Sequence, residues 1–178
     1  MKNIPIKKLV LAALFAALTF AATTVIRIPV PTGAGYINLG DCLVLLSGFI
    51  LGPYFGAFSA GIGSALADVL SAPIYAPATF IIKALMALIA GFLFRFSKKH
   101  ITIWVVICGL IGEAIMVIGY YIFEAFMLGY GWAPSALNIP PNIFQGITGV
   151  AAAAILIQIF IQKKKKSPDD DYEDDDEA

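Results

Sequence analysis

The chain has 178 residues, of which 60% are hydrophobic and 13% are charged, and its formal net charge is zero. Soluble domains are usually about 45–50% apolar and about 25% charged. A water-soluble globule of this length could not bury so much apolar side-chain surface. The composition therefore excludes a cytosolic enzyme, a nucleic-acid-binding protein and a secreted disulfide-rich scaffold, and it indicates an integral membrane protein.

Five apolar runs follow one another along the chain, and together they predict six membrane-spanning helices. The runs are Ile6–Ile26, Leu39–Leu70, Ala78–Phe96, Ile101–Leu128 and Ile139–Gln162. A transmembrane helix needs about 20 residues, so the second run is too long for a single helix. Pro53 lacks an amide hydrogen and disfavours helix at the residue before it, which predicts a tight turn that divides this run into two spans. The predicted fold class is an all-α integral membrane protein with six transmembrane helices.

The basic residues predict the orientation of these helices. They lie before the first helix, between the fourth and fifth helices, and after the last one: Lys2, Lys7, Lys8, Arg95, Lys98, Lys99 and Lys163–Lys166. The connections at the opposite ends contain only Arg27. Because basic connections stay on the cytoplasmic side, both termini are predicted to be cytoplasmic. Residues 1–162 are predicted to form the membrane domain, which binds the substrate, and residues 163–178 a charged, disordered cytoplasmic tail.

Ionisable residues within the spans indicate a binding site. Each costs about 2.5–3.5 kcal/mol near the bilayer centre on insertion scales, so such groups normally face the protein interior. With the orientation above, nearly all of them lie in the outer half of the membrane. Glu113, Tyr120 and Glu124 are spaced to lie within about 20° of one stripe on a helix. We therefore predict a pocket that opens outward, walled by the helices of the last three runs.

The predicted pocket contains eight candidate substrate-contacting residues, and aromatic side chains near its mouth suit a flat heterocyclic ligand. The candidates are Tyr36, Asn38, Lys83, Glu113, Tyr120, Glu124, Asn142 and Gln145. Asp41 and Asp68 are predicted to be structural polar residues. Lys83 has two open interpretations, an internal ion pair with one of these aspartates or a contact with the ligand. The connection from Arg27 to Gly40 is either a lid over the pocket or a simple ordered loop.

Motifs of catalysis, phosphate binding and metal binding are missing from the sequence, so we predict no enzyme activity, no cofactor and no metal site. Cys42 and Cys108 lie in different apolar runs and are predicted to be free and inert. In the first run, Ala12 and Ala16 are four residues apart, a spacing that lets another helix approach closely in lipid. They could pack within the protein or form a docking surface for a partner.

Three segments resemble one family of membrane proteins. They are Gly-Tyr-Ile-Asn-Leu-Gly-Asp at residues 35–41, the stretch Leu51–Asp68, which begins Leu-Gly-Pro-Tyr-Phe-Gly, and Tyr75–Gly91, which begins Tyr-Ala-Pro-Ala-Thr-Phe. In this order and spacing they resemble the substrate-binding S components of energy-coupling factor (ECF) vitamin transporters, most closely the riboflavin-type group. The resemblance extends over about residues 6–162.

This resemblance implies a six-helix bundle in the prokaryotic plasma membrane that captures a B-type vitamin of the riboflavin, pyridoxine or hydroxymethylpyrimidine class at its outer face. It implies docking through Ala12 and Ala16 onto a transmembrane coupling subunit that carries two ATP-binding subunits, after which the ligand is delivered inward. Sites in the family use the first outer loop and the last three helices, which here contain Tyr36, Asn38, Lys83, Glu124, Asn142 and Gln145.

Two alternative functions are open from the residues themselves. A stand-alone carrier of small solutes would support uptake into vesicles that contain only this protein. A membrane scaffold that binds no ligand would tolerate Lys83→Ala and Glu124→Ala but would fail with Ala12→Leu or Ala16→Leu.

Overall fold

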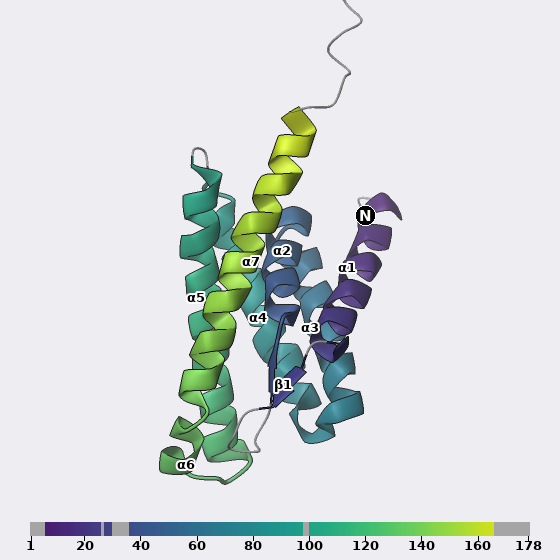
Figure 1. Ribbon diagram of the computed structural model, residues 1–178. Helices are drawn as coiled ribbons and strands as arrows, with labels where there is room; N and C mark the ends of the chain where they lie inside the picture. Colours follow the sequence, from purple (N-terminus) through teal and green to yellow (C-terminus); the bar gives the residue numbers. More distant parts are fainter. Residues whose placement is uncertain (1–5, 26, 30–35, 98–99, 166–178) are drawn as a thin grey trace, which may run out of the picture.

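The computed structural model describes residues 6–25, 27–29, 36–97 and 100–165, and in these ranges the chain is a helical bundle (Figure 1). All the predicted apolar helices are present, and the fold class is confirmed as that of an all-α bundle suited to a membrane. The long helices are α1 (Ile6–Val25), α2 (Gly40–Leu51), α3 (Pro53–Ser71), α4 (Ala76–Phe94), α5 (Ile101–Ile122) and α7 (Ile139–Lys165).

Four helical segments in the described part of the chain are long and apolar enough to cross a bilayer: Ile6–Val25, Pro73–Phe94, Ile101–Met127 and Trp132–Ile159. Helix α2 has only 12 residues. At about 1.5 Å per residue it is shorter than the hydrocarbon core, which is about 30 Å thick. The structure thus fits an integral membrane protein, while the number of six spans stays a prediction.

The predicted break in the second apolar run is confirmed. Helix α2 ends at Leu51, Pro53 is the first residue of α3, and Gly52 between them has φ +83°, which favours glycine. Helices α2, α3 and α4 approach each other closely at Gly48. A Cβ atom at Gly56 would lie 2.6 Å from the Gly48 Cα atom, and one at Gly91 would lie 2.6 Å from the Gly48 carbonyl oxygen. Glycines at this corner therefore allow the backbones to touch.

Several short elements were not predicted from the sequence. Strands β1 (Arg27–Pro29) and β2 (Tyr36–Asn38) pair in antiparallel fashion, with Arg27 opposite Asn38. A 3-10 turn, η1 (Pro73–Tyr75), precedes α4, and a π-helical turn, η2 (Phe123–Met127), ends α5. The short helix α6 (Trp132–Ala136) lies between this turn and α7. Segments of three to five residues carry too little hydrophobic periodicity to be recognised from sequence.

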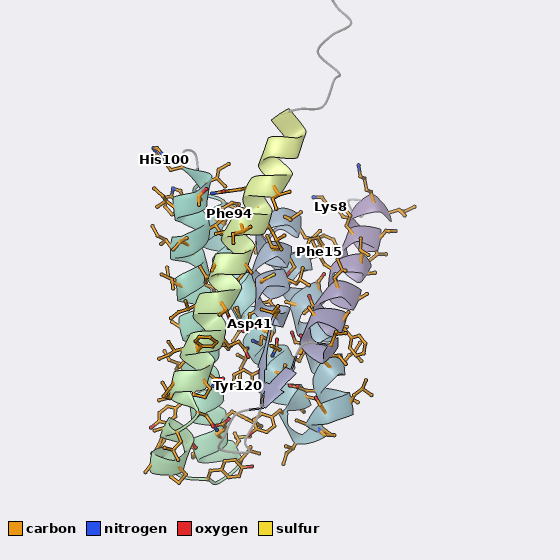
Figure 2. All side chains as sticks on the ribbon, viewed as in Figure 1. Lys8, Phe15, Asp41, Phe94, His100 and Tyr120 are labelled. Atoms are coloured by element: carbon orange, nitrogen blue, oxygen red, sulfur yellow. The ribbon has the colours of Figure 1, made fainter. Side chains whose placement is uncertain are left out.

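The two ends of the bundle differ. The start of α1, the start of α5 and the end of α7 lie at one end, whereas α6 lies at the other and the β1–β2 hairpin lies in the half toward α6 (Figure 1). Side-chain labels show Asp41 near the middle of the bundle and Tyr120 closer to the hairpin end (Figure 2). Helix α7 continues to Lys165, past the predicted domain boundary at residue 162, and residues 166–178 lie outside the described part.

Candidate functional site

A polar cavity is formed among α1, α3, α4, α5 and α7. Its lining includes six of the eight predicted contact residues: Asn38, Lys83, Tyr120, Glu124, Asn142 and Gln145. The remaining lining residues are Thr23, Ser64, Asp68, Ala72, Tyr75, Thr79, Asn138 and Pro141. The three predicted wall helices, α4, α5 and α7, all contribute to the lining. Residues of α1 and α3 complete the cavity, and these two helices were not predicted to line it.

Lys83 and Asp41 form a buried ion pair beside the cavity. The Lys83 ammonium donates to Asp41 Oδ1 and to the Met116 sulfur, which is 3.1 Å away. The ammonium also lies 5.7 Å from the centroid of the Tyr120 ring, within the range of a cation–π contact. Of the two open interpretations of Lys83, the structure shows the internal pair with Asp41, and it also places Lys83 in the cavity wall.

Gln145 connects this ion pair to the hairpin. Its side-chain nitrogen donates to Asp41 Oδ2 at 2.6 Å, and its side-chain oxygen accepts from the backbone N–H of Asn38 at 2.9 Å and from Asn38 Nδ2 at 3.3 Å. Asn38 Oδ1 in turn accepts from the backbone N–H of Gly40 at 2.8 Å. One amide side chain on α7 thus holds the end of β2 and the start of α2 in place.

The two acids that line the cavity, Glu124 and Asp68, accept hydrogen bonds from neutral donors. Asn138 donates to Glu124 Oε2 at 2.8 Å, and the Tyr75 hydroxyl donates to Glu124 Oε1 at 3.4 Å. Thr79 donates to Asp68 Oδ2 at 2.5 Å, and its hydroxyl lies 2.9 Å from that of Tyr120. Asp68, predicted as a structural residue, therefore also lines the cavity.

Glu113 is buried, with 4% of its surface exposed, and it is not among the residues that line the cavity. It packs against α7, where a Cβ atom at Gly146 would lie 2.9 Å from the Glu113 Cβ atom. Neither carboxyl oxygen has a hydrogen-bond partner within the described residues. The spacing argument placed Glu113 on the same stripe as Tyr120, but Glu113 lies about two turns deeper, beneath the floor of the cavity. A ligand contact for Glu113 stays a prediction that this placement does not favour.

Tyr36 pairs through its backbone with Pro29 in the hairpin, and its side chain lies outside the described part of the chain. Among the residues that sequence reasoning did not select, Thr23 comes from the end of α1 and Asn138 from the residue before α7. Thr23 lies inside the first apolar run and Asn138 directly before the last one, and sequence reasoning gave neither residue a role. The signal that could have found Asn138 is its position directly before the first residue of α7, two residues ahead of the first of two consecutive prolines.

The described residues contain no group of three or more His, Cys, Asp or Glu side chains that could hold a metal ion. Cys42 and Cys108 are free and buried, as predicted.

A separate apolar groove runs between α1 and α3, and it is lined by Ala12, Ala13, Ala16 and Ala17 together with apolar side chains of α3. The Ala12 carbonyl oxygen accepts from the Ser59 hydroxyl at 2.9 Å, and the Ala16 carbonyl oxygen packs against Gly63. Ala12 and Ala16 thus take part in the contact of α1 with α3, whereas Ala13 and Ala17 are exposed.

Comparison with known proteins identifies the family. A family model described as "ECF-type riboflavin transporter, S component" matches residues 3–162. The chain belongs to this family. This S component is therefore a membrane protein of a transporter family, as the resemblance in its sequence implied.

Two relatives differ in what is known of them. A Pyrococcus woesei protein described as "Uncharacterized protein in gap 3'region" is 36% identical over 129 residues, which cover 72% of this S component and 84% of the relative. The "Thiamine precursor transporter HmpT" of Lactococcus lactis subsp. cremoris (strain MG1363) is 32% identical over 158 residues, which cover 88% of this chain and 89% of HmpT.

A solved structure supports the fold. It is described as "Structure and mechanism of the S component of a bacterial ECF transporter" and aligns with a TM-score of 0.68 at 23% identity, covering 90% of this chain and 98% of the other. At this identity the likeness concerns the fold alone. The family description names riboflavin and the HmpT description names a thiamine precursor, so the two descriptions point to different ligands.

Proposed function

We propose that this S component is the substrate-binding subunit of an ECF-type importer and that its cavity binds a thiamine precursor of the hydroxymethylpyrimidine class. The observation that carries the proposal is the carboxylate of Glu124 in the cavity wall, held between the Asn138 amide and the Tyr75 hydroxyl and flanked by aromatic rings. The 32% identity with HmpT over most of both chains supports the same ligand class.

The chemistry of an aminopyrimidine matches this wall. Its exocyclic amine and the adjacent ring nitrogen lie in one plane, so a carboxylate can meet both with two parallel hydrogen bonds when the ring nitrogen is protonated. Tyr75 stands 6.4 Å from Tyr120 and 5.6 Å from Phe123 between ring centroids, which forms an aromatic side to the cavity. Flat rings bind such surfaces by stacking or edge contacts. The hydroxymethyl group would find amide partners in Asn38 and Asn142, which also line the cavity.

We propose a membrane topology in which all six long helices cross the plasma membrane and both termini are cytoplasmic. Helices α2 and α3 are joined at Gly52. The β1–β2 hairpin then lies toward the outer face, because it is in the half of the bundle away from the start of α1 (Figure 1). The cavity lies with it, because Asn38 of β2 is in the cavity wall. The basic residues at the other end support this orientation.

Transport in this proposal requires partners. The groove between α1 and α3 is lined almost entirely by apolar side chains, and alanines give it a smooth floor. We propose that this face docks onto a transmembrane coupling subunit that carries two ATP-binding subunits. Ala13 and Ala17 present their methyl groups outward and would contact the partner, while Ala12 and Ala16 let α1 lie close to α3.

A binding titration with the purified protein tests the proposed ligand. Isothermal titration calorimetry should show saturable binding of hydroxymethylpyrimidine that is tighter than that of pyridoxine, riboflavin or thiamine. Glu124→Gln keeps the shape of the side chain but removes its charge. Hydrogen bonds to charged groups contribute about 1.5–3 kcal/mol, so this variant should bind about 10- to 100-fold more weakly.

Glu113→Gln is the matched control, since it makes the same chemical change on the same helix but outside the cavity wall. It should bind within about threefold of the wild type, a difference of less than 1 kcal/mol. Absence of saturable binding to any of the four compounds would refute the proposed function. Tighter binding of riboflavin or pyridoxine would keep the subunit role but replace the ligand.

A further inference from the structure

We propose that Asp41 determines the charge of the ligand that the cavity accepts, because it masks the ammonium of Lys83. The cavity then takes hydroxymethylpyrimidine, whose hydroxymethyl group is uncharged, and rejects its phosphate monoester. This inference rests on the proposed function and adds to it the charge class of the ligand and the residue that selects it. Asp41 acts through Lys83 and is a positioning residue rather than a contact.

Lys83 is the only basic side chain among the described residues that line the cavity. An exposed ammonium in such a wall would be a natural partner for a phosphate or carboxylate group of a ligand. In this protein the Lys83 ammonium is paired with a carboxylate, since it donates to Asp41 Oδ1 and contacts the Met116 sulfur at 3.1 Å. The Lys83 side chain is 4% exposed. The basic residue of the cavity wall therefore presents an ion pair and not a free positive charge.

Asp41 lies behind this wall. It is fully buried and is not among the residues that line the cavity. Its second oxygen accepts from Gln145 at 2.6 Å, so both carboxylate oxygens are occupied and the carboxylate is held in one position. A ligand phosphate would compete with Asp41 for the ammonium, and drawing the ammonium away would leave Asp41 buried and charged without its partner.

A phosphate monoester carries about −1.5 to −2 charges at neutral pH. The cavity wall also contains the carboxylates of Asp68 and Glu124, and bringing like charges together costs binding free energy. The free alcohol carries no negative charge and meets none of these costs. The geometry therefore selects the dephosphorylated form of the ligand.

A second buried acid lies near the pair. A Cβ atom at Gly149 would lie 3.0 Å from the Asp41 Cβ atom and 3.0 Å from Glu113 Oε1. The Glu113 oxygens have no hydrogen-bond partner within the described residues, so Glu113 could accept from Lys83 when Asp41 is neutralised. A test of Asp41 must therefore include a variant in which Glu113 is neutralised as well.

The test measures the ratio of two dissociation constants by calorimetry at pH 7.5, that of the phosphate monoester of hydroxymethylpyrimidine over that of the alcohol. The wild type should bind the ester at least about 100-fold more weakly, the equivalent of about 2.7 kcal/mol. In Asp41→Asn/Glu113→Gln the ammonium is unmasked, and the ratio should fall at least about 10-fold, because the ester binds more tightly. Asp41→Asn/Lys83→Met removes both charges of the pair and should restore a high ratio.

Two results would overturn the inference. One is a wild type that binds the ester as tightly as the alcohol, a result that needs no variant to fold. The other is an unchanged ratio in Asp41→Asn/Glu113→Gln, since a purely structural ion pair would weaken both ligands equally when it is lost. Failure of the wild type to bind the alcohol at all would instead refute the proposed function.

Discussion

Gln145 is the side chain on which the arrangement of the cavity depends most, and its replacement by methionine tests this dependence. Methionine has nearly the same length and fits the same space but offers neither a strong donor nor a strong acceptor. Gln145→Met removes the donor to Asp41 and the acceptor of the Asn38 backbone N–H. Gln145 itself is 3% exposed and Asn38 is 8% exposed, so both ends of the lost network are buried.

The expected loss follows from these two contacts. A hydrogen bond to a charged group contributes about 1.5–3 kcal/mol, and an unsatisfied buried donor costs about 1–3 kcal/mol. Water that enters from the cavity will replace part of the lost acceptor. We therefore expect Gln145→Met to lower the free energy of unfolding by about 3 kcal/mol, near the lower end of the combined range. Ligand affinity should fall as well, because Asn38 then loses its anchor to α7.

Gln158→Met on the same helix is the matched control. Gln158 donates to the Thr102 hydroxyl at 3.0 Å in an exposed pair, and exposed substitutions usually change stability by less than about 0.5 kcal/mol. Both variants can be unfolded by titration with sodium dodecyl sulfate in mixed micelles, with tryptophan fluorescence as the signal. Equal midpoints for Gln145→Met and Gln158→Met would refute the view that the Asn38–Gln145–Asp41 connection holds the site together.

Two further predictions concern the helix contacts. Gly48→Ala places a methyl group 2.5 Å from the Ala87 carbonyl oxygen, and it should lower the free energy of unfolding by about 3 kcal/mol, at the upper end of typical overpacking. Gly109→Ala, whose new methyl group meets mainly the Val150 side chain, should lower it less, and the reverse order would contradict the role of the backbone contact at Gly48. Ala13→Leu/Ala17→Leu should abolish co-purification with the coupling subunit and its two ATP-binding subunits while ligand binding persists. Ala114 is an exposed alanine on α5, and Ala114→Leu should leave co-purification intact. Retention of the complex in Ala13→Leu/Ala17→Leu would contradict docking through the groove.

Much of the fold follows from the sequence because hydrophobic runs and proline dominate local structure in a membrane protein. The runs gave the positions of the long helices to within a few residues, and Pro53 gave the corner between α2 and α3. The small elements η1, η2 and the β1–β2 hairpin depend on contacts made by the completed bundle. The end of β2, for example, is anchored by Gln145, 107 residues away along the chain.

The candidate site was predictable in its chemistry but less so in its depth. The cost of ionisable groups in lipid selected Lys83 and Glu124, and helical spacing added Tyr120; all three line the cavity. The sequence placed Glu113 deeper on the helix than Glu124, but periodicity could not show where the cavity ends, so Glu113 was kept as a candidate contact.

The ion-pair partner of a buried charge was harder to predict than the charged residue itself. Asp41 and Asp68 were equal choices for Lys83 by sequence, and the choice of Asp41 needs the packing of α2 against α4.

Labelling of a cysteine in the cavity tests the central claim most directly. The background carries Cys42→Ser and Cys108→Ala, so that the new thiol is the one labelled. In whole cells, Asn142→Cys should react with a membrane-impermeant thiosulfonate. Saturating hydroxymethylpyrimidine should slow this reaction at least about 10-fold. Lys8→Cys, an exposed position near the start of α1, should react only in inside-out vesicles (Figure 2). Reaction of Asn142→Cys from the inside alone, or at a rate that the ligand does not change, would contradict an outward-facing binding site.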